Sequence, residues 1–103
     1  MEKMPAPSAT EGTSQKRLPK KIVALKYLLR RSLIQPEAHQ LYGESCLHST
    51  ISTLANEHYL AFERVPENYG MFNARFTRYT LKEESRERAE RLVDFYTQKL
   101  KAA

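Results

Sequence analysis

The chain has 103 residues, of which 41% are hydrophobic, 28% carry a charge and one is a cysteine. This length suits a single domain with a modest core, and a lone cysteine excludes an internal disulfide framework. No apolar run approaches the roughly 18 residues that a membrane-spanning helix needs, and the N-terminus lacks a signal-peptide pattern. We therefore expect a cytoplasmic protein without a membrane partner.

The positive charge is concentrated in the first third of the chain. The 17 Lys and Arg residues exceed the 12 Asp and Glu residues, which gives a net charge of +5. Residues 1–36 hold eight of the basic residues but only two acids, and no acid lies between Glu11 and Glu37. This distribution is compatible with a solvated tail and one basic helix face, or with a region that contacts phosphates.

The first half of the chain predicts a tail followed by two helices. Residues 1–17 are rich in Pro, Ala, Ser, Thr and Gly, so we expect a flexible tail. From Leu18 to Ser32, apolar residues recur at helical spacing, which predicts a basic amphipathic helix. The run Gln35-Pro36-Glu37 is a helix-start signal. The short helix that it begins is expected to end at Gly43.

A third helix is predicted over residues 45–58. Ser45 is a plausible N-cap, and Leu47, Ile51 and Leu54 form one apolar stripe at helical spacing. The opposite face of this helix carries the polar residues His48, Ser49, Ser52, Thr53 and Asn56.

The second half of the chain predicts a hairpin and a long helix. Residues 59–65 and 74–81 are rich in aromatic and β-branched residues, and Pro66 to Gly70 have turn chemistry, which predicts a β-hairpin with a long loop. Residues 82–100 combine dense charge with apolar residues at helical spacing and predict a C-terminal helix that frays over residues 101–103. The fold class expected is α+β, mainly α with a small hairpin.

Three helices followed by a two-stranded wing is the element order of a winged helix-turn-helix domain. Residues 22–81 resemble such domains. The segments that carry the resemblance are Gln35-Pro36-Glu37-Ala38, Gly43, Leu47-x3-Ile51-x2-Leu54 and Arg78-Tyr79-Thr80-Leu81. They are similar to small helix-turn-helix domains of phages and prophages. The resemblance implies a DNA-binding regulatory or accessory protein of a bacterial host, associated with the nucleoid when bound to DNA. Residues 82–103 lie outside the resemblance and are a possible dimerisation element.

Helix 45–58 takes the place of the recognition helix in this resemblance. Its polar face could bond base edges in the major groove of double-stranded DNA, and Asn56 could pair bidentately with adenine. The helix contains no Lys or Arg, however, although Arg to guanine is the commonest specific contact. An ordinary polar surface is therefore the competing interpretation.

Two basic regions flank this helix. Arg64, Arg75 and Arg78 surround the predicted hairpin and would suit phosphate or minor-groove contacts; alternatively they protect a sheet edge from pairing. Lys20 and Lys21 lie on the first helix and could contact phosphates beside the main groove, or could simply be solvated.

The C-terminal helix has an apolar stripe with two possible partners. It could pack on the domain's own core or pair with a second copy of the chain to form a homodimer. The residues expected at such a seam are Leu92, Val93, Tyr96 and Leu100.

No pattern in the sequence indicates catalysis. The three histidines lack the spacing of a metal site, and the phosphate-binding and nucleophile motifs rich in glycine are missing from a chain with three glycines. Cys46 at a helix start could have a lowered pKa, or be a half-buried structural residue. We therefore expect that the protein is not an enzyme and that it binds no metal, cofactor or small-molecule ligand.

The sequence thus favours a DNA-binding protein, either a transcriptional regulator or an accessory factor in recombination or replication. The alternative is a protein–protein interaction module, such as an inhibitor or adaptor, on the same scaffold.

Overall fold

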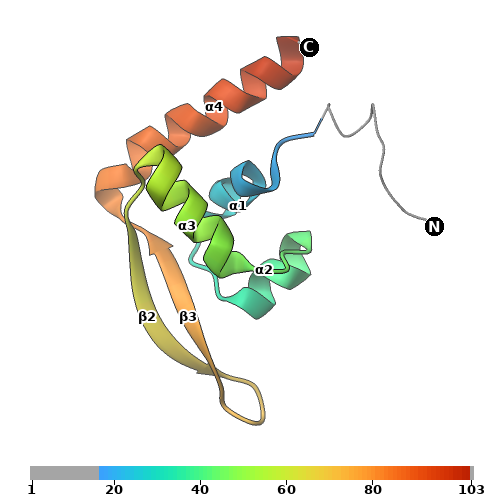
Figure 1. Ribbon diagram of the computed structural model, residues 1–103, viewed down its shortest axis with the longest axis vertical. Coiled ribbons are helices and arrows are strands. Elements are labelled where there is room, and N and C mark those ends of the chain that lie inside the picture. Colours follow the sequence, from blue (N-terminus) through green and yellow to red (C-terminus); the bar gives the residue numbers. More distant parts are fainter. Residues whose placement is uncertain (1–16, 103) are drawn as a thin grey trace, which may run out of the picture.

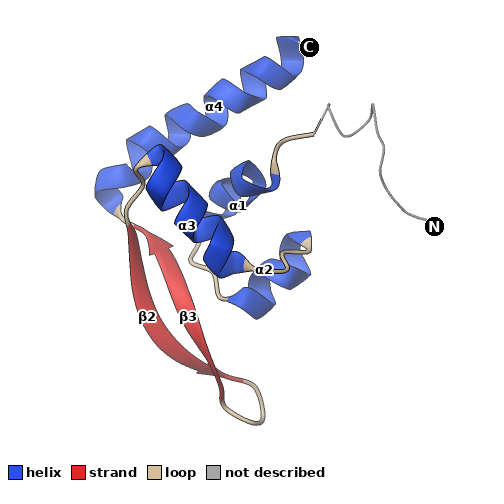
Figure 2. Cartoon of the chain, in the orientation of Figure 1, coloured by secondary structure: helices blue, strands red, loops and turns tan. Residues whose placement is uncertain are grey.

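The computed structural model describes residues 17–102, so the expected tail lies outside the described residues except for Arg17. Four helices and a two-stranded antiparallel hairpin give an α+β fold, as predicted (Figure 1, Figure 2). The elements are α1 (Lys20–Leu28), α2 (Gln35–Tyr42), α3 (Leu47–His58), β2 (Phe62–Tyr69), β3 (Ala74–Leu81), a 3-10 turn (Glu83–Ser85) and α4 (Arg86–Ala102). In Figure 1 the hairpin projects from one end of the helices, and α4 crosses them at the other end.

The core lies where α1, α3 and the base of the hairpin meet. Apolar residues at helical spacing on α1 and α3 point into it, and the ends of both strands and the start of α4 close it. Fully or almost fully buried side chains include Ile22, Leu25, Leu28, Leu33, Ile34, Leu47, Ile51, Leu54, Leu60, Phe62, Tyr79, Leu81 and Ala89. Each large side chain of this kind stabilises the fold by about 1.5–3 kcal/mol relative to exposure.

Helix α1 ends at Leu28, four residues earlier than the sequence predicts. The reason is a contact far along the chain, because Leu33 forms an isolated antiparallel bridge with Tyr79. Their backbone N–H groups and carbonyl oxygens bond reciprocally at 3.0 and 2.8 Å. Extended backbone is required for this bridge, so the helix must stop before it. Strand β3 consequently has a neighbour on both of its edges at Tyr79, with Leu33 on one side and Arg64 of β2 on the other.

Helix α2 is confirmed, whereas α3 begins two residues later than expected. The Glu37 carboxylate accepts the backbone N–H of Ile34 at 3.2 Å, which satisfies one donor at the start of α2. Gly43 ends α2 with φ 74°, a left-handed conformation that favours glycine. The prediction that Ser45 caps α3 is wrong, since α3 starts at Leu47 and other side chains hold its first turn.

The hairpin is longer and its loop shorter than predicted. Residues 66–69, which have turn chemistry in the sequence, are paired in β2, with Pro66 opposite Thr77. A proline is tolerated there because β2 is an edge strand. The loop is only residues 70–73, with φ 81° at Gly70 and 54° at Asn73. Residues 59–61 are not strand, because Tyr59 adopts φ 57° and ends α3.

The C-terminal segment starts with the 3-10 turn and continues as α4 through Ala102, so the fraying predicted at residue 101 is not observed. The Ser85 hydroxyl accepts the backbone N–H of Ala61 at 2.8 Å, and Arg86 donates to the carbonyl of Leu29 at 2.8 Å. These bonds attach the start of α4 to the rest of the fold. Within residues 17–102, no helix combines the length and apolarity that crossing a bilayer requires.

Candidate nucleic-acid interface

Helix α3 separates its apolar and polar residues cleanly. Leu47, Ile51 and Leu54 are almost fully buried and fix the helix on the core. On the opposite side His48, Ser49 and Asn56 are exposed, and Ser52 and Thr53 are half-buried. The five polar residues predicted to contact DNA therefore form one accessible face of a helix that the core holds in place.

Two side chains outside α3 replace the missing serine cap. The Gln35 amide accepts the backbone N–H of Leu47 and donates to the carbonyl of Glu44 at 2.7 Å. The buried Glu44 carboxylate accepts the backbone N–H of Cys46 at 3.2 Å and the hydroxyl of Thr50 at 2.7 Å. These bonds satisfy donors at the start of α3 and fix the angle between α2 and α3.

The Glu44 carboxyl stays ionised despite its burial. Burial by itself raises its pKa, but the hydrogen bonds from Thr50 and Cys46 lower it. A bond from the hydroxyl of Tyr42 at 3.0 Å, and the Lys20 ammonium at 4.0 Å, act in the same direction. The net result is a pKa below the ordinary value of a glutamate.

One face of the hairpin turns toward α3. Side chains alternate between the two faces of a strand, so the register places Arg64 and Arg75 on the same face as Tyr79. The Tyr79 hydroxyl lies 3.3 Å from Nδ1 of His48, which joins this face to the first turn of α3. The Arg64 guanidinium lies 5.8 Å from the centre of the Tyr79 ring.

A hollow of about 330 Å³ lies between α3 and this hairpin face. Its lining includes His48 from α3 and Arg75, Thr77 and Tyr79 from β3. Arg75 is exposed and has no hydrogen-bond or ion-pair partner among the described residues. The polar start of α3 and an available guanidinium therefore border the same concave surface.

Arg78 lies on the other face of the hairpin and is fully engaged. It forms a bidentate pair with Glu67, at 2.6 and 2.7 Å, and another with Glu37, at 3.1 and 3.2 Å. It also donates to the hydroxyl of Ser32 at 3.0 Å. Its hydrogen bonds to the carboxylates of Glu67 and Glu37 raise the pKa of Arg78 above the usual range of an arginine. The structure thus gives Arg78 the role of linking the wing to α2.

The two lysines predicted to contact phosphates lie at the start of α1. Lys20 is about half exposed and has Glu44 as its nearest carboxylate. Lys21 is more enclosed: its ammonium lies 3.5 Å from Glu57 and 5.9 Å from the centre of the Tyr96 ring. Lys21 therefore holds α1 against α3 and α4 within the chain.

The residues predicted for dimerisation are mostly turned inward. Leu92 and Val93 are half-buried and pack against the chain's own core. Tyr96 and Leu100 are also half-buried. The exposed apolar side chain of α4 is instead Phe95, which is 60% exposed.

Sequence reasoning also missed two apolar residues at the tip of the hairpin. Met71 and Phe72 are 87% and 90% exposed, at the far end of the wing. The sequence signal for their exposure is their position in a turn that begins with a glycine and ends with an asparagine. Side chains inside such a turn point into solvent. Large apolar side chains held out in this way commonly mark a contact surface.

Two further reactive side chains among the described residues are Cys46 and His58. Cys46 is exposed, and a hydrogen bond between its sulfur and the hydroxyl of Ser49, 3.2 Å apart, lowers the pKa of the thiol. His58 has a buried Nε2 with no hydrogen-bond partner among the described residues, and burial lowers the pKa of its imidazole. No group of three or more His, Cys, Asp or Glu side chains that could hold a metal ion occurs within residues 17–102.

Comparisons of this chain with protein-family models, with curated proteins and with solved structures gave no match.

Proposed function

We propose that this chain is a DNA-binding protein of the winged helix-turn-helix type, acting as a transcriptional regulator or as an accessory factor in recombination or replication. The observation that carries the proposal is the shared concave surface: His48, in the first turn of α3, and the available Arg75 border one hollow. A helix side by side with a projecting two-stranded ribbon suits a duplex, because the helix enters the major groove while the ribbon follows the backbone.

Helix α3 supplies the base contacts in this proposal. Asn56 is exposed and can pair bidentately with adenine, while Ser49, Ser52 and Thr53 bond base edges or phosphates. Because α3 carries no cation, its contacts add specificity more than affinity. Affinity must come from the guanidinium and ammonium groups around it.

The wing and α1 supply those charges. Arg75 and Arg64 lie on the hairpin face that turns toward α3, so they meet the phosphates beside the groove that α3 occupies. Lys20 and Arg30 are exposed near α1 and extend the basic surface, whereas Arg31 is paired with Glu37 at 2.8 Å. Met71 and Phe72 at the wing tip enter the minor groove, where apolar side chains partly unstack a base step.

The test is binding of the purified full chain to genomic fragments and to a shuffled control, measured by fluorescence polarisation at two salt concentrations. We expect specific binding that weakens steeply with salt, since each neutralised phosphate adds about 0.9 to the slope of log K against log salt concentration. Asn56→Ala should abolish the preference between fragments while retaining the salt slope. Absence of any binding at low salt contradicts the proposal.

A second candidate is a protein–protein interaction module on the same scaffold. The exposed Met71 and Phe72, together with a recognition helix that lacks Lys and Arg, favour it. Retention on a heparin column discriminates between the two candidates. The retention of a protein–protein interaction module should not depend on salt concentration, whereas the retention of a phosphate-binding protein should decrease as the salt concentration rises.

A further inference from the structure

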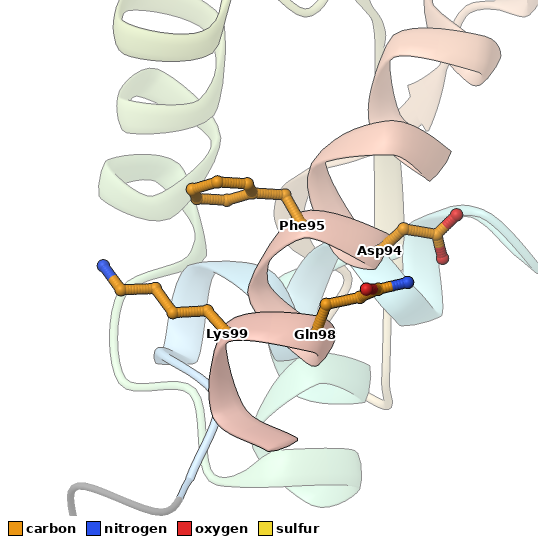
Figure 3. Close-up of a pocket in the computed structure, with 4 residues that line it drawn as sticks. All are labelled: Asp94, Phe95, Gln98 and Lys99. Carbon is orange, nitrogen blue, oxygen red and sulfur yellow. The ribbon is translucent and has the colours of Figure 1, made fainter. Parts of the chain in front are cut away.

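The outer face of α4 carries a row of side chains with opposite charges at its two ends. Glu87, Arg91, Phe95 and Lys99 follow one another at intervals of four residues, and all four are exposed. Side chains at this spacing form a ridge along a helix surface, and such ridges pack against each other when two helices cross. In Figure 3, Phe95 and Lys99 extend to the same side of α4, while Asp94 and Gln98 extend to the other side.

A hollow adjoins this row on the same face. It measures about 360 Å³ and lies between the end of α3 and the first half of α4. Its lining includes Tyr59, Arg91, Leu92 and Phe95. Tyr59 is 74% exposed and Phe95 60% exposed. A protruding phenyl ring and a partly apolar hollow therefore lie next to each other, which is the arrangement that a twofold-symmetric contact requires.

We propose that the chain forms a twofold-symmetric dimer in which the α4 helices cross in antiparallel orientation and each Phe95 enters the hollow of the other copy. Pairing Phe95 of one copy with Arg91 of the other also places Glu87 opposite Lys99. The two ends of the row then attract each other, and the ring of Phe95 lies beside the Arg91 guanidinium, which also pairs with Glu87 of its own chain. Parallel pairing would place like charges together, so the charge order selects the antiparallel arrangement.

This dimer uses a different surface from the candidate nucleic-acid interface. Phe95 lies on α4, and in Figure 1 α4 lies at the opposite end of the molecule from the tip of the hairpin. It also differs from the seam expected from the sequence, because Leu92 and Val93 already pack on the chain's own core. The inference does not depend on DNA binding, and its test contains no DNA.

The test is sedimentation equilibrium of the full chain at concentrations up to roughly 100 µM, which detects a dimer of micromolar affinity. We expect a monomer–dimer equilibrium. Phe95→Ser should raise the dissociation constant about tenfold or more, as loss of a central aromatic anchor does. Because Phe95 is mainly exposed, the thermal midpoint of this variant should stay close to that of the wild type.

Charge-reversal variants test whether the two α4 helices cross in antiparallel orientation. Glu87→Lys and Lys99→Glu should each weaken the dimer, and the two changes in one chain should restore it, since each reversed end again meets its opposite. Glu90→Lys, the same charge change at an exposed position outside the row, serves as the control and should leave the dimer unchanged. A monomer at every concentration, a dimer indifferent to Phe95→Ser, or a double reversal that fails to recover association each overturns the proposal.

Discussion

Arg75 and Arg78 lie three positions apart on β3 and have opposite surroundings. Arg75 faces the hollow beside α3 and has no charged partner among residues 17–101, whereas Arg78 is held by Glu37 and Glu67. A guanidinium can contribute to DNA binding only if it is not already neutralised. Arg75 therefore reports on the proposed DNA contact of the hairpin, and Arg78 reports on how the hairpin is held to the rest of the fold.

Replacing each of these arginines by alanine should give opposite results. Arg75→Ala should reduce the salt slope of DNA binding by about one and leave the free energy of unfolding unchanged. Arg78→Ala removes charge-assisted hydrogen bonds to two carboxylates and should lower the free energy of unfolding by about 1–2 kcal/mol. Polarisation titrations and urea denaturation measure the two quantities. Equal effects of both variants on DNA binding would contradict the assignment.

Glu44 makes the stability of the α2–α3 turn sensitive to acid. Its pKa in the folded chain lies below the ordinary glutamate value of 4.5. Its contribution is therefore complete above about pH 4.5 and is lost as the pH falls through the lower, folded value. Glu44→Gln should lower the free energy of unfolding at pH 7 by about 1–3 kcal/mol and make its decline below pH 4.5 shallower.

Urea denaturation between pH 3 and pH 7 measures both effects of the Glu44 change. The exposed Glu90→Gln on α4 is the matched control, because it makes the same chemical change away from the turn. An unchanged acid dependence in Glu44→Gln would show that other carboxylates, such as Glu37, account for it.

At this scale the sequence predicts which residues are polar and accessible, but not their partners. The helical spacing of Leu47, Ile51 and Leu54 was enough to place the polar face of α3 correctly. The pairing of Arg78 with Glu37 spans 41 residues, and no local pattern contains it. The same holds for Gln35, whose bonds to the start of α3 depend on how two helices meet.

The hairpin is the element whose limits the sequence predicted least well. Its turn chemistry at residues 66–69 suggested a long loop, yet cross-strand pairing continues to Tyr69. The buried ends of the strands place Phe62 opposite Leu81 and so set the register of the hairpin. This register overrides the local preference of residues 66–69 for a turn. Because β2 continues to Tyr69, Met71 and Phe72 lie farther from the core than the sequence indicates.

Replacing both tip residues by serine tests the wing as an element. Met71→Ser with Phe72→Ser should leave the thermal midpoint unchanged, because neither side chain contributes to the core. DNA affinity should fall about tenfold, and any bend in the bound duplex should decrease, since an apolar wedge favours a kink. Binding curves and circular-permutation gel mobility measure these effects. If DNA binding is unaffected, the tip residues do not contact DNA.

At the scale of the whole molecule, the proposed dimerisation and the proposed DNA binding together predict the form of the DNA site. A twofold protein imposes twofold symmetry on its site, with half-sites separated by about one helical turn or a multiple of it. Selection of bound sequences from a random DNA pool should therefore give an inverted repeat. With Phe95→Ser the selected sites should shorten to single half-sites. A direct repeat or an asymmetric consensus would argue against the antiparallel α4 dimer.

The bridge between Leu33 and Tyr79 has a consequence for how the molecule folds. It connects the segment between α1 and α2 to a strand 46 residues later in the chain, and Tyr79 is buried in the folded protein. Neither partner can satisfy its backbone groups until both halves of the chain have met, so the wing acquires its final anchor late. Amide hydrogens at Leu33 and Tyr79 should consequently exchange with solvent only through global opening, whereas those near the hairpin tip exchange through local fraying. The hairpin is thus expected to be rigid at its base, next to the bridge, and flexible near its tip.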